Sequence, residues 1–427
     1  MAHLLLLEVP GGNDFNILEE AVRLGHEVTF FTADINVYLA HHTLATSKLS
    51  LAREVIALTP FDYASFEAAA LSLHAKKPFD AILCLIDIRM IEAAKLAERL
   101  KLKFLNANTA TLIRDKFSVR ARLAQHRIRQ PRFQLATSNQ ELKQAIGTIG
   151  FPVLIKPSDG YGSQNILTFT SEAAFNALAE PFANYLPLKT DYGFGVLAND
   201  RLVVEEFIRG EVIGCETFTV NGKHSFLGIN DKVFFAPPCF GIKGSCFPSS
   251  RFDTATIRDY VFQILDALDF DFGAAHTEII ITPDGLPYLV EVNPRLIGAH
   301  IPRLLGFALE RSIYADVINL HLGDDLAQLQ NIRPQQVAVS RWITSTQNGI
   351  LKAIIPPEIS AEMPSSGIRA VHIFKQPGDR VRPPFDNADR LGFVMVVGKT
   401  QADAERWAEE FVSNTQVRLE DAAAAST

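Results

Sequence analysis

The stretch 276–293 carries the residue types with the clearest chemical potential in this chain. Two strand-like segments flank an Asp-Gly dipeptide at 284–285, which is typical of a hairpin turn. If the hairpin closes symmetrically about that dipeptide, Glu278 lies opposite Glu291. Directly opposed like charges destabilise a strand pair, so a cation is expected between the two carboxylates. A solvent-facing hairpin with incidental acids is the alternative explanation.

The residues around this acid pair complete a candidate metal site. With a strand period of two, Asn293 shares a face with Glu291, and His276 shares a face with Glu278. Carboxylate and amide oxygens suit Mg²⁺, or Mn²⁺ in its place, so Glu278, Glu291 and Asn293 are predicted metal ligands. Arg295 follows, and its guanidinium can neutralise charge on a transferring phosphoryl group. His276 is predicted to face the site, although core packing explains it nearly as well.

A lysine and a glycine-rich loop form a candidate phosphate-binding element upstream. Lys156 stands near the end of a strand-like run, and the loop follows it at once. Free N–H groups of such a loop can lie over phosphates, although a plain β-turn explains the loop equally well. Lys116, at the start of a predicted helix, is a second candidate, and an exposed helix lysine is its default interpretation. The loop candidates are Gly160, Tyr161, Gly162 and Ser163.

An acidic strand end is the candidate nucleoside-binding element. Glu205 and Glu206 close an apolar run, and Phe207 and Ile208 follow them. Carboxylates at this point can bind ribose hydroxyls, while the adjoining backbone can hydrogen-bond an adenine edge. Solvated glutamates at a strand end are the alternative. We include Glu216 among the nucleotide-binding candidates.

An alternation of strands and helices must position these residues from the N-terminal side. This pattern indicates a parallel sheet with right-handed crossovers, and we assign it to an α/β domain at 1–112. The turn at 10–13 lacks the glycine spacing of a dinucleotide-binding loop. The predicted strands of this domain are 4–9, 27–32, 81–85 and 103–105. Helices are predicted at 87–100, 116–125, 254–268 and 401–413, and a further strand at 337–344.

Composition and charge exclude several classes of protein. The chain has 427 residues and a net charge of −7, which argues against nucleic-acid binding. No apolar run approaches the ~20 residues of a membrane-spanning helix, and the N-terminus has no basic region before its leucines. The four cysteines form no C-x-x-C pair and are expected to be buried free thiols. We therefore expect a cytoplasmic protein with no membrane partner.

In combination, these stretches resemble the ATP-grasp superfamily. Within it the chain is most similar to L-amino-acid ligases, because 273–278 matches their G-x-x-H-x-E element. The chain departs from those ligases at Ile242 and Ser245, within a segment where they often carry an acidic residue and a Gly-His pair, and this leaves the amine substrate open. The resemblance runs in order through Lys116, Lys156 with its glycine loop, Glu205, Glu206, Glu278 and the E-x-N-x-R element at 291–295.

The resemblance implies an α/β architecture of three parts and a two-step reaction. An N-terminal parallel-sheet domain would precede a small lid domain at 113–210 and a larger C-terminal α+β domain at 211–427 that holds the metal. A carboxylate would take the γ-phosphoryl group of ATP, and an amine would then attack the acyl phosphate. Both substrates would be amino acids, that is small molecules, and a homodimer is expected from the family alone.

The resemblance also implies roles for individual residues. Lys116 and Lys156 would bind the phosphates of ATP, and the glycine loop would close over the acyl phosphate as a lid. The residues expected to act in catalysis are Arg295, His276 and Lys156. Substrate contacts are expected from Arg295, His300, Arg303, Arg341 and Trp342, although a tryptophan in the core is the commoner case.

Two other functions share most of these residues. A carboxylase-type enzyme that activates bicarbonate for a carrier would need the same fold and nucleotide site. A nucleotide-binding regulator without catalysis would keep the fold, but the intact acid, amide and arginine set at 278–295 argues against it.

Overall fold

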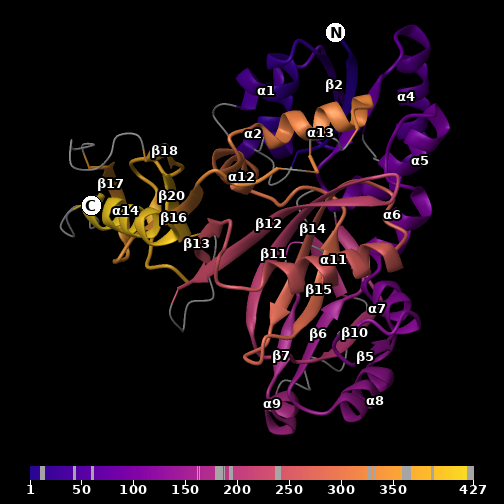
Figure 1. Cartoon of the computed structure of the whole chain (residues 1–427), viewed down its shortest axis with the longest axis vertical. Helices are drawn as coiled ribbons and strands as arrows, with labels where there is room; N and C mark the ends of the chain where they lie inside the picture. The colour runs from indigo at the N-terminus through magenta and orange to yellow at the C-terminus, as the bar shows by residue number, and fades with distance from the viewer. Residues whose placement is uncertain are drawn as a thin grey trace, which may run out of the picture.

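Figure 1 shows the computed structural model of the 427-residue chain. It describes all residues except 10–14, 42–44, 59–61, 161, 163, 178–185, 187, 192–195, 236–241, 326–328, 331, 358–366, 386–388 and 421–427. The predicted turn at 10–13 and the loop residues Tyr161 and Ser163 therefore lie outside the described residues.

The N-terminal region contains a four-stranded parallel sheet in the order β3-β2-β1-β4. Every residue of β1 and β4 is buried, as expected for a parallel sheet with helices on its faces. The predicted strand and helix alternation is therefore confirmed here. The elements are β1 (His3–Leu7), α1 (Asn16–Arg23), β2 (Glu27–Thr32), α2 (Asn36–His41), α3 (Ala45–Leu49), β3 (Glu54–Ala57), α4 (Tyr63–Lys76) and β4 (Ala81–Cys84).

Two details after β4 differ from the prediction. The helix expected from residue 87 begins with one 3₁₀ turn, Asp87–Arg89, before α5 (Met90–Leu100). Residues 103–105 were predicted as a strand but form an irregular segment between α5 and the next helix. This segment is held by side-chain contacts: Leu105 is buried, and the Lys103 ammonium donates to the carbonyl of Gly323 at 3.3 Å. The helices α6 (Ala107–Arg114) and α7 (Lys116–Gln125) follow.

A second, small sheet has the order β5-β10-β6-β7 and its own hydrophobic core. The helix α8 (Asn139–Ile149) begins at Ser138, whose hydroxyl accepts from the Glu141 N–H, and it buries Leu142 and Ile146 against one face of the sheet. Lys156 and Glu205 alternate with the core residues of β6 and β10, so their side chains lie on the opposite face of the sheet. The strands are β5 (Phe133–Ala136), β6 (Val153–Pro157), β7 (Leu167–Phe169) and β10 (Leu202–Glu206), and α9 (Glu172–Ala177) follows β7.

The main sheet has eight strands in the order β15-β14-β11-β12-β13-β16-β20-β18, and each neighbouring pair is antiparallel. It runs from the carboxylate hairpin at one edge to the C-terminal strands at the other (Figure 1). The strands are β11 (Glu211–Val220), β12 (Lys223–Phe234), β13 (Ile242–Phe247), β14 (Phe272–Ile281), β15 (Pro287–Asn293), β16 (Val337–Thr344), β18 (Ile368–Ile373) and β20 (Arg390–Gly398).

Different helices cover the two faces of this sheet. The helices α12 (Ile301–Leu309) and α13 (Ile313–Leu322) share one hydrophobic core with the N-terminal sheet and with one face of the main sheet, and Figure 1 shows α13 beside β2. The helix α14 (Gln401–Asn414) packs on the opposite face at β16 and β20. Alternation along β16 therefore sends Arg341 and Trp342 to opposite faces.

The remaining elements are short. The helix α11 (Thr254–Ala267) packs beside the hairpin, and a three-stranded sheet joins β17 (Gly349–Ile355), β19 (Arg380–Val381) and β21 (Gln416–Leu419). The strands β8 (Leu188–Asp191) and β9 (Val196–Asn199) form a separate pair. Across the described residues, no helix is long and apolar enough to cross a bilayer.

Candidate functional site

In the carboxylate hairpin of β14 and β15, the strand ends far from the turn have the predicted register. Glu278 lies opposite Glu291, and His276 lies opposite Asn293. The register then shifts between Glu278 and Ile279, so Ile279 pairs with Leu289 and the bulge leaves Val290 as the extra residue. The prediction of two facing carboxylates is confirmed, whereas symmetric pairing up to the turn is wrong because of the bulge.

Two lysines from outside the hairpin neutralise the opposed carboxylates. The Lys232 ammonium, from β12, lies 2.5 Å from Glu278, and the Lys116 ammonium, from the first turn of α7, lies 3.5 Å from Glu291. Burial alone would lower the pKa of Lys232, but Glu278 outweighs it and raises that pKa. Each of the two opposed acids thus has its own ammonium partner, Lys232 for Glu278 and Lys116 for Glu291.

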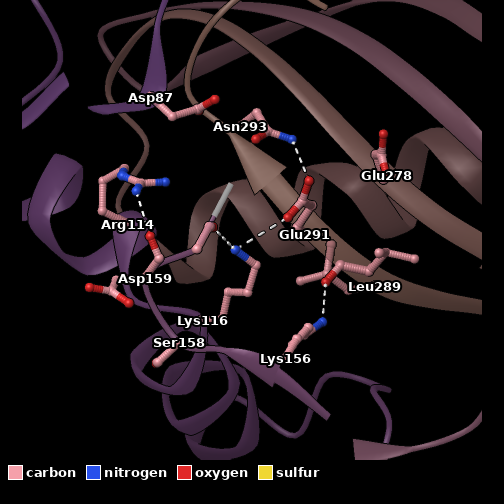
Figure 2. A network of polar contacts seen from close by, with 12 residues as sticks. Asp87, Arg114, Lys116, Lys156, Ser158, Asp159, Glu278, Leu289, Glu291 and Asn293 are labelled. Carbon is pink, nitrogen blue, oxygen red and sulfur yellow. Dashed lines mark hydrogen bonds and ion pairs between the residues drawn. The ribbon is translucent and has the colours of Figure 1, made fainter. Parts of the chain in front are cut away.

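Asn293 and Arg295 connect this acid pair to the N-terminal domain. The Asn293 amide donates to Glu291 at 3.3 Å (Figure 2), and the Arg295 guanidinium donates to Asp87 at 2.9 Å. Asp87 is only 3% exposed, and its second oxygen has no hydrogen-bond partner among the described residues. Burial would raise the pKa of Asp87, but the Arg295 charge lowers it overall. The arginine predicted beside the phosphoryl group is therefore held in place by an acid that comes from the first domain.

His276 lies in a buried chain of charges behind Glu278. Its Nδ1 is 2.7 Å from Glu216 and its Nε2 is 3.1 Å from Glu278. Burial alone would lower the pKa of His276, but the two carboxylates raise it to about 9, so the ring is a cation at neutral pH. A Cβ at Gly214 would lie 2.6 Å from the ring, so glycine leaves the space that the imidazole needs. Glu216 contacts His276 and is 2% exposed; its carboxylate does not face open space.

Lys156 and Glu205 form a second, fully buried charge cluster. Glu205 accepts from the Lys156 ammonium at 2.9 Å and from the Arg120 guanidinium at 2.8 Å. Both cations also reach backbone at the bulge, since Lys156 lies 3.4 Å and Arg120 3.1 Å from the carbonyl of Val290. Burial would raise the pKa of Glu205, but Arg120 and Lys156 lower it to about 2. Glu205 was predicted to bind ribose, yet its carboxylate is occupied by these cations and instead fixes Lys156.

The described part of the glycine loop lies against Lys116. The Lys116 ammonium donates to the carbonyl of Gly160, and its backbone N–H donates to Ser158 at 2.8 Å. Gly162 has a φ of 68°, a left-handed conformation that glycine adopts at little cost. The loop therefore begins beside the ammonium that contacts Glu291, as a phosphate-binding loop requires (Figure 2).

The rest of the predicted nucleoside element lies at the rim of the small sheet. Glu206 pairs with Arg132 at 3.2 Å, and the Phe207 N–H donates to the carbonyl of Pro152 at 3.1 Å. The Phe207 side chain is 36% exposed, and Ile208 is half-buried. Phe207 and Ile208 thus offer an accessible apolar edge, while the Glu206 carboxylate is directed to Arg132.

The predicted substrate residues separate into three places. Arg341 points to α14, where Glu409 accepts from it at 2.7 Å, so the structure does not bring it to the acid pair. Trp342 lies on the other face, with its ring 4.8 Å from His300. Arg303 is exposed on α12, one turn after His300. Within the described residues, Arg295 is the one of the five that contacts the hairpin next to the acid pair, donating to the Asn293 side-chain oxygen at 3.4 Å.

Four residues of this region were missed by sequence reasoning. Lys232 from β12 and Asp87 from the 3₁₀ turn before α5 contact predicted site residues, and Arg120 neutralises Glu205 from α7. Asn230 is fully buried two residues before Lys232 on the same face of β12, and neither polar atom of its amide has a partner among the described residues. The signal in the sequence that could have found Lys232 was the charged pair Asp231-Lys232 next to apolar strand residues.

The donor set fits Mg²⁺ bound together with phosphate. Among the described residues, no group of three or more His, Cys, Asp or Glu side chains is placed to hold a metal ion. The candidate ligands are instead the Glu278 and Glu291 carboxylates and the Asn293 amide, all hard oxygen donors. Mg²⁺ keeps several ligands from water or substrate phosphates, so two carboxylates and one amide are sufficient protein ligands.

Comparisons with known families assign three consecutive parts of the chain. Residues 18–102 match an ATP-grasp N-terminal domain, 149–302 match an ATP-grasp domain, and 341–420 match an L-amino acid ligase C-terminal domain 2. The second match spans Lys156, the acid pair and Arg295, which the geometry brings together.

Individual relatives are distant but cover much of the chain. An uncharacterized protein, y4rH, of Sinorhizobium fredii is 26% identical over 302 residues, which are 68% of this chain and 58% of that protein. An L-arginine-specific L-amino acid ligase of Bacillus subtilis is 23% identical over 310 residues, 71% of each chain. The crystal structure of an L-amino acid ligase from Bacillus licheniformis superposes with a TM-score of 0.79 at 21% identity and covers 99% of both chains. The ATP-grasp fold is therefore shown.

Proposed function

We propose that this chain, a member of the ATP-grasp superfamily, is a ligase that joins a carboxylate to an amine with ATP as the energy source. The observation that carries the proposal is the convergence of Glu278, Glu291 and Asn293 with Arg295 and Lys116 in one cluster drawn from two parts of the chain. This combination provides metal ligands, phosphate-binding cations and a guanidinium for a charged transition state.

Each residue of the cluster has a physical task in phosphoryl transfer. Glu278, Glu291 and Asn293 would hold Mg²⁺, which when bound neutralises phosphate charge and orients the phosphates. Lys116 and Lys156 bind phosphate oxygens, and Glu205 holds Lys156 in position at 2.9 Å. Arg295, fixed by Asp87, neutralises charge on the oxygens of the transferred group.

The proposed reaction has two balanced steps. An oxygen of the substrate carboxylate attacks the γ-phosphorus of ATP, the bond to the β-phosphate oxygen breaks, and ADP and an acyl phosphate form. The amine nitrogen then attacks the acyl carbon, the bond to the phosphate oxygen breaks, and the nitrogen loses one proton. Water would destroy the acyl phosphate, so closure of the glycine loop over the site is part of the proposal.

We further propose amino acids as both substrates. Two observations favour them over bicarbonate and a carrier: the C-terminal match is to a domain of L-amino acid ligases, and the Bacillus subtilis relative is named for such an activity. The identities of the two amino acids, and which of them is activated, belong to experiment.

The test is phosphate release from ATP and Mg²⁺ with every single and paired L-amino acid, with mass spectrometry of the products. We expect release that requires a particular pair and yields a dipeptide. Release that requires bicarbonate and a carrier would identify a carboxylase-type enzyme instead. Binding of ATP without release under any condition would contradict a ligase.

A further inference from the structure

Besides Asn230, two side chains near β16 on the catalytic face of the main sheet have buried polar atoms without partners among the described residues. Ser340 on β16 is 1% exposed and His300 at the start of α12 is 7% exposed. Within the described part of the chain, the Ser340 hydroxyl and both ring nitrogens of His300 have no hydrogen-bond partner. Buried polar groups are normally satisfied, so these atoms indicate that a molecule, either water or a ligand, is the missing partner.

Strand register connects these atoms to the acid pair. Lys232, which contacts Glu278, lies opposite Ser245 on β13, and Ser245 lies opposite Ser340 on β16. Residues directly opposite in a sheet point to the same face, and neighbouring strands lie roughly 4.8 Å apart. A polar row therefore leads from Lys232, the partner of Glu278, to Ser340, about 10 Å from Lys232 by that spacing.

Aromatic rings surround the far end of this row. Trp342 shares the face of Ser340, and the His300 ring lies 4.8 Å from Trp342 and stacks on Phe393 at 4.1 Å. Phe374 lies 5.9 Å from Trp342 and is 41% exposed, so the aromatic group reaches solvent at the β18 side. The row thus joins a charged end at Lys232 to an apolar end that a ligand can approach from outside.

The apolar end is neutral or positive. Burial, and then the charges of Arg390 and Arg303, lower the pKa of His300 to about 3, so its ring is uncharged at neutral pH. The Arg390 guanidinium lies 4.0 Å from the centre of the Trp342 ring. None of the residues in the row or the aromatic group is an acid. A cationic side chain of a ligand would therefore meet repulsion without a compensating carboxylate.

We propose that Ser340, His300, Trp342 and Phe393 form the subsite for the side chain of one amino-acid substrate, and that this subsite selects neutral apolar or aromatic side chains over cationic ones. This inference rests on the proposed ligase function. The indole and phenyl rings provide the apolar walls, and the Ser340 hydroxyl and the His300 ring supply hydrogen bonds to a neutral polar tip such as the hydroxyl of tyrosine.

The test compares substrate preference in the wild-type enzyme with that in Trp342→Ala and Ser340→Ala. With the best partner amino acid fixed, we expect wild-type kcat/KM for phenylalanine, tyrosine or methionine to exceed that for lysine or arginine by about tenfold or more. Trp342→Ala should lower kcat/KM for the aromatic substrates about tenfold, and Ser340→Ala should selectively raise KM for tyrosine relative to phenylalanine. The KM for ATP should stay within about twofold in both variants.

A matched control separates this role from a structural one. Ile343→Val alters a buried residue on the opposite face of the same strand and should leave substrate preference unchanged. If the wild-type enzyme forms dipeptides but prefers cationic residues, or if Trp342→Ala and Ser340→Ala behave like Ile343→Val, the subsite is wrong while the ligase function stands. Absence of phosphate release with every pair would instead refute the ligase function, and the subsite with it.

Discussion

Two histidines on one face of the main sheet differ in charge because their surroundings differ. His276 contacts the Glu216 and Glu278 carboxylates, which outweigh its burial and raise its pKa to about 9. His300 is stacked among Phe393 and Trp342, and burial lowers its pKa to about 3. One end of the face is therefore built from ion pairs, and the other end is apolar with a neutral imidazole.

This difference separates two tasks within one sheet. At the charged end Lys232 and Lys116 lie against the acid pair, and in the proposed reaction a metal ion would pair with the carboxylates while phosphates would pair with the ammonium groups. The neutral end cannot stabilise phosphoryl charge, but it can distinguish side chains by size and polarity. Substitutions at the two ends should therefore change different quantities: turnover and Mg²⁺ affinity at the charged end, substrate preference and pH-dependent stability at the neutral end.

The largest expected effect is on turnover in Glu291→Gln. Loss of the carboxylate removes one metal ligand and leaves the Lys116 ammonium without its charge partner, so we expect the phosphate-release rate to fall about 100-fold or more. The control is Glu410→Gln, which changes an exposed acid on α14 and should retain the wild-type rate. Equal rates in the two variants would remove Glu291 from the mechanism.

Glu216→Gln should weaken the charged end without removing a proposed metal ligand. The His276 ring loses its strongest charge partner, so its pKa should fall from about 9 toward its ordinary value of 6.5. Glu278 is then held less firmly, and we expect Mg²⁺ affinity in the presence of ATP to fall about tenfold. Histidine titration by NMR checks the first effect and calorimetry the second; an unchanged His276 pKa would contradict the charge chain.

His300→Phe should change how stability depends on pH. The folded pKa of His300, about 3, lies below the ordinary 6.5, so the unfolded chain binds a proton first as pH falls. Stability is therefore full above about 6.5 and is lost as pH falls toward about 3. Because phenylalanine does not titrate, the variant should lose about 2–3 kcal/mol less than wild type between pH 7 and 4.5 in urea unfolding. Parallel losses in both proteins would show that His300 is not a buried neutral ring.

The smallest expected effect is on the stability of Ser340→Ala. Its hydroxyl has no partner, so its removal should leave the free energy of unfolding unchanged or raise it by up to about 1 kcal/mol. Ser345→Ala is the matched control, because the Ser345 hydroxyl is buried and donates to the carbonyl of Gln347 at 2.7 Å. That variant should be destabilised by about 1 kcal/mol. A destabilised Ser340→Ala would mean that the hydroxyl has a structural partner.

Local patterns in the sequence predicted much of the charged end. A turn dipeptide and strand alternation placed Glu278 opposite Glu291, and the start of α7 coincides with Lys116. These features depend on neighbours within a few residues. The alternating strands and helices of the first region likewise predicted its parallel sheet, because each strand or helix can be recognised from the hydrophobic pattern of its own residues.

The features of the site that could not be predicted from the sequence depend on contacts between residues far apart in the chain. Asp87, in the 3₁₀ turn before α5, and Lys232, on β12, are far from the hairpin in sequence, and no local pattern indicates which charged residue a distant group will meet. The bulge at Val290 follows no turn signal, yet it exposes the carbonyl that Arg120 and Lys156 approach. Arg341 could be assigned to a strand, but only the position of α14 shows which face it occupies.

The most direct test of the central claim is Mn²⁺ binding followed by electron paramagnetic resonance, with and without ATP, in wild type, Glu278→Gln and Glu410→Gln. We expect wild type and Glu410→Gln to bind Mn²⁺ tightly only with ATP, and Glu278→Gln to lose about tenfold or more in that affinity. Identical Mn²⁺ affinity in all three proteins would show that the hairpin is not the metal and phosphate site.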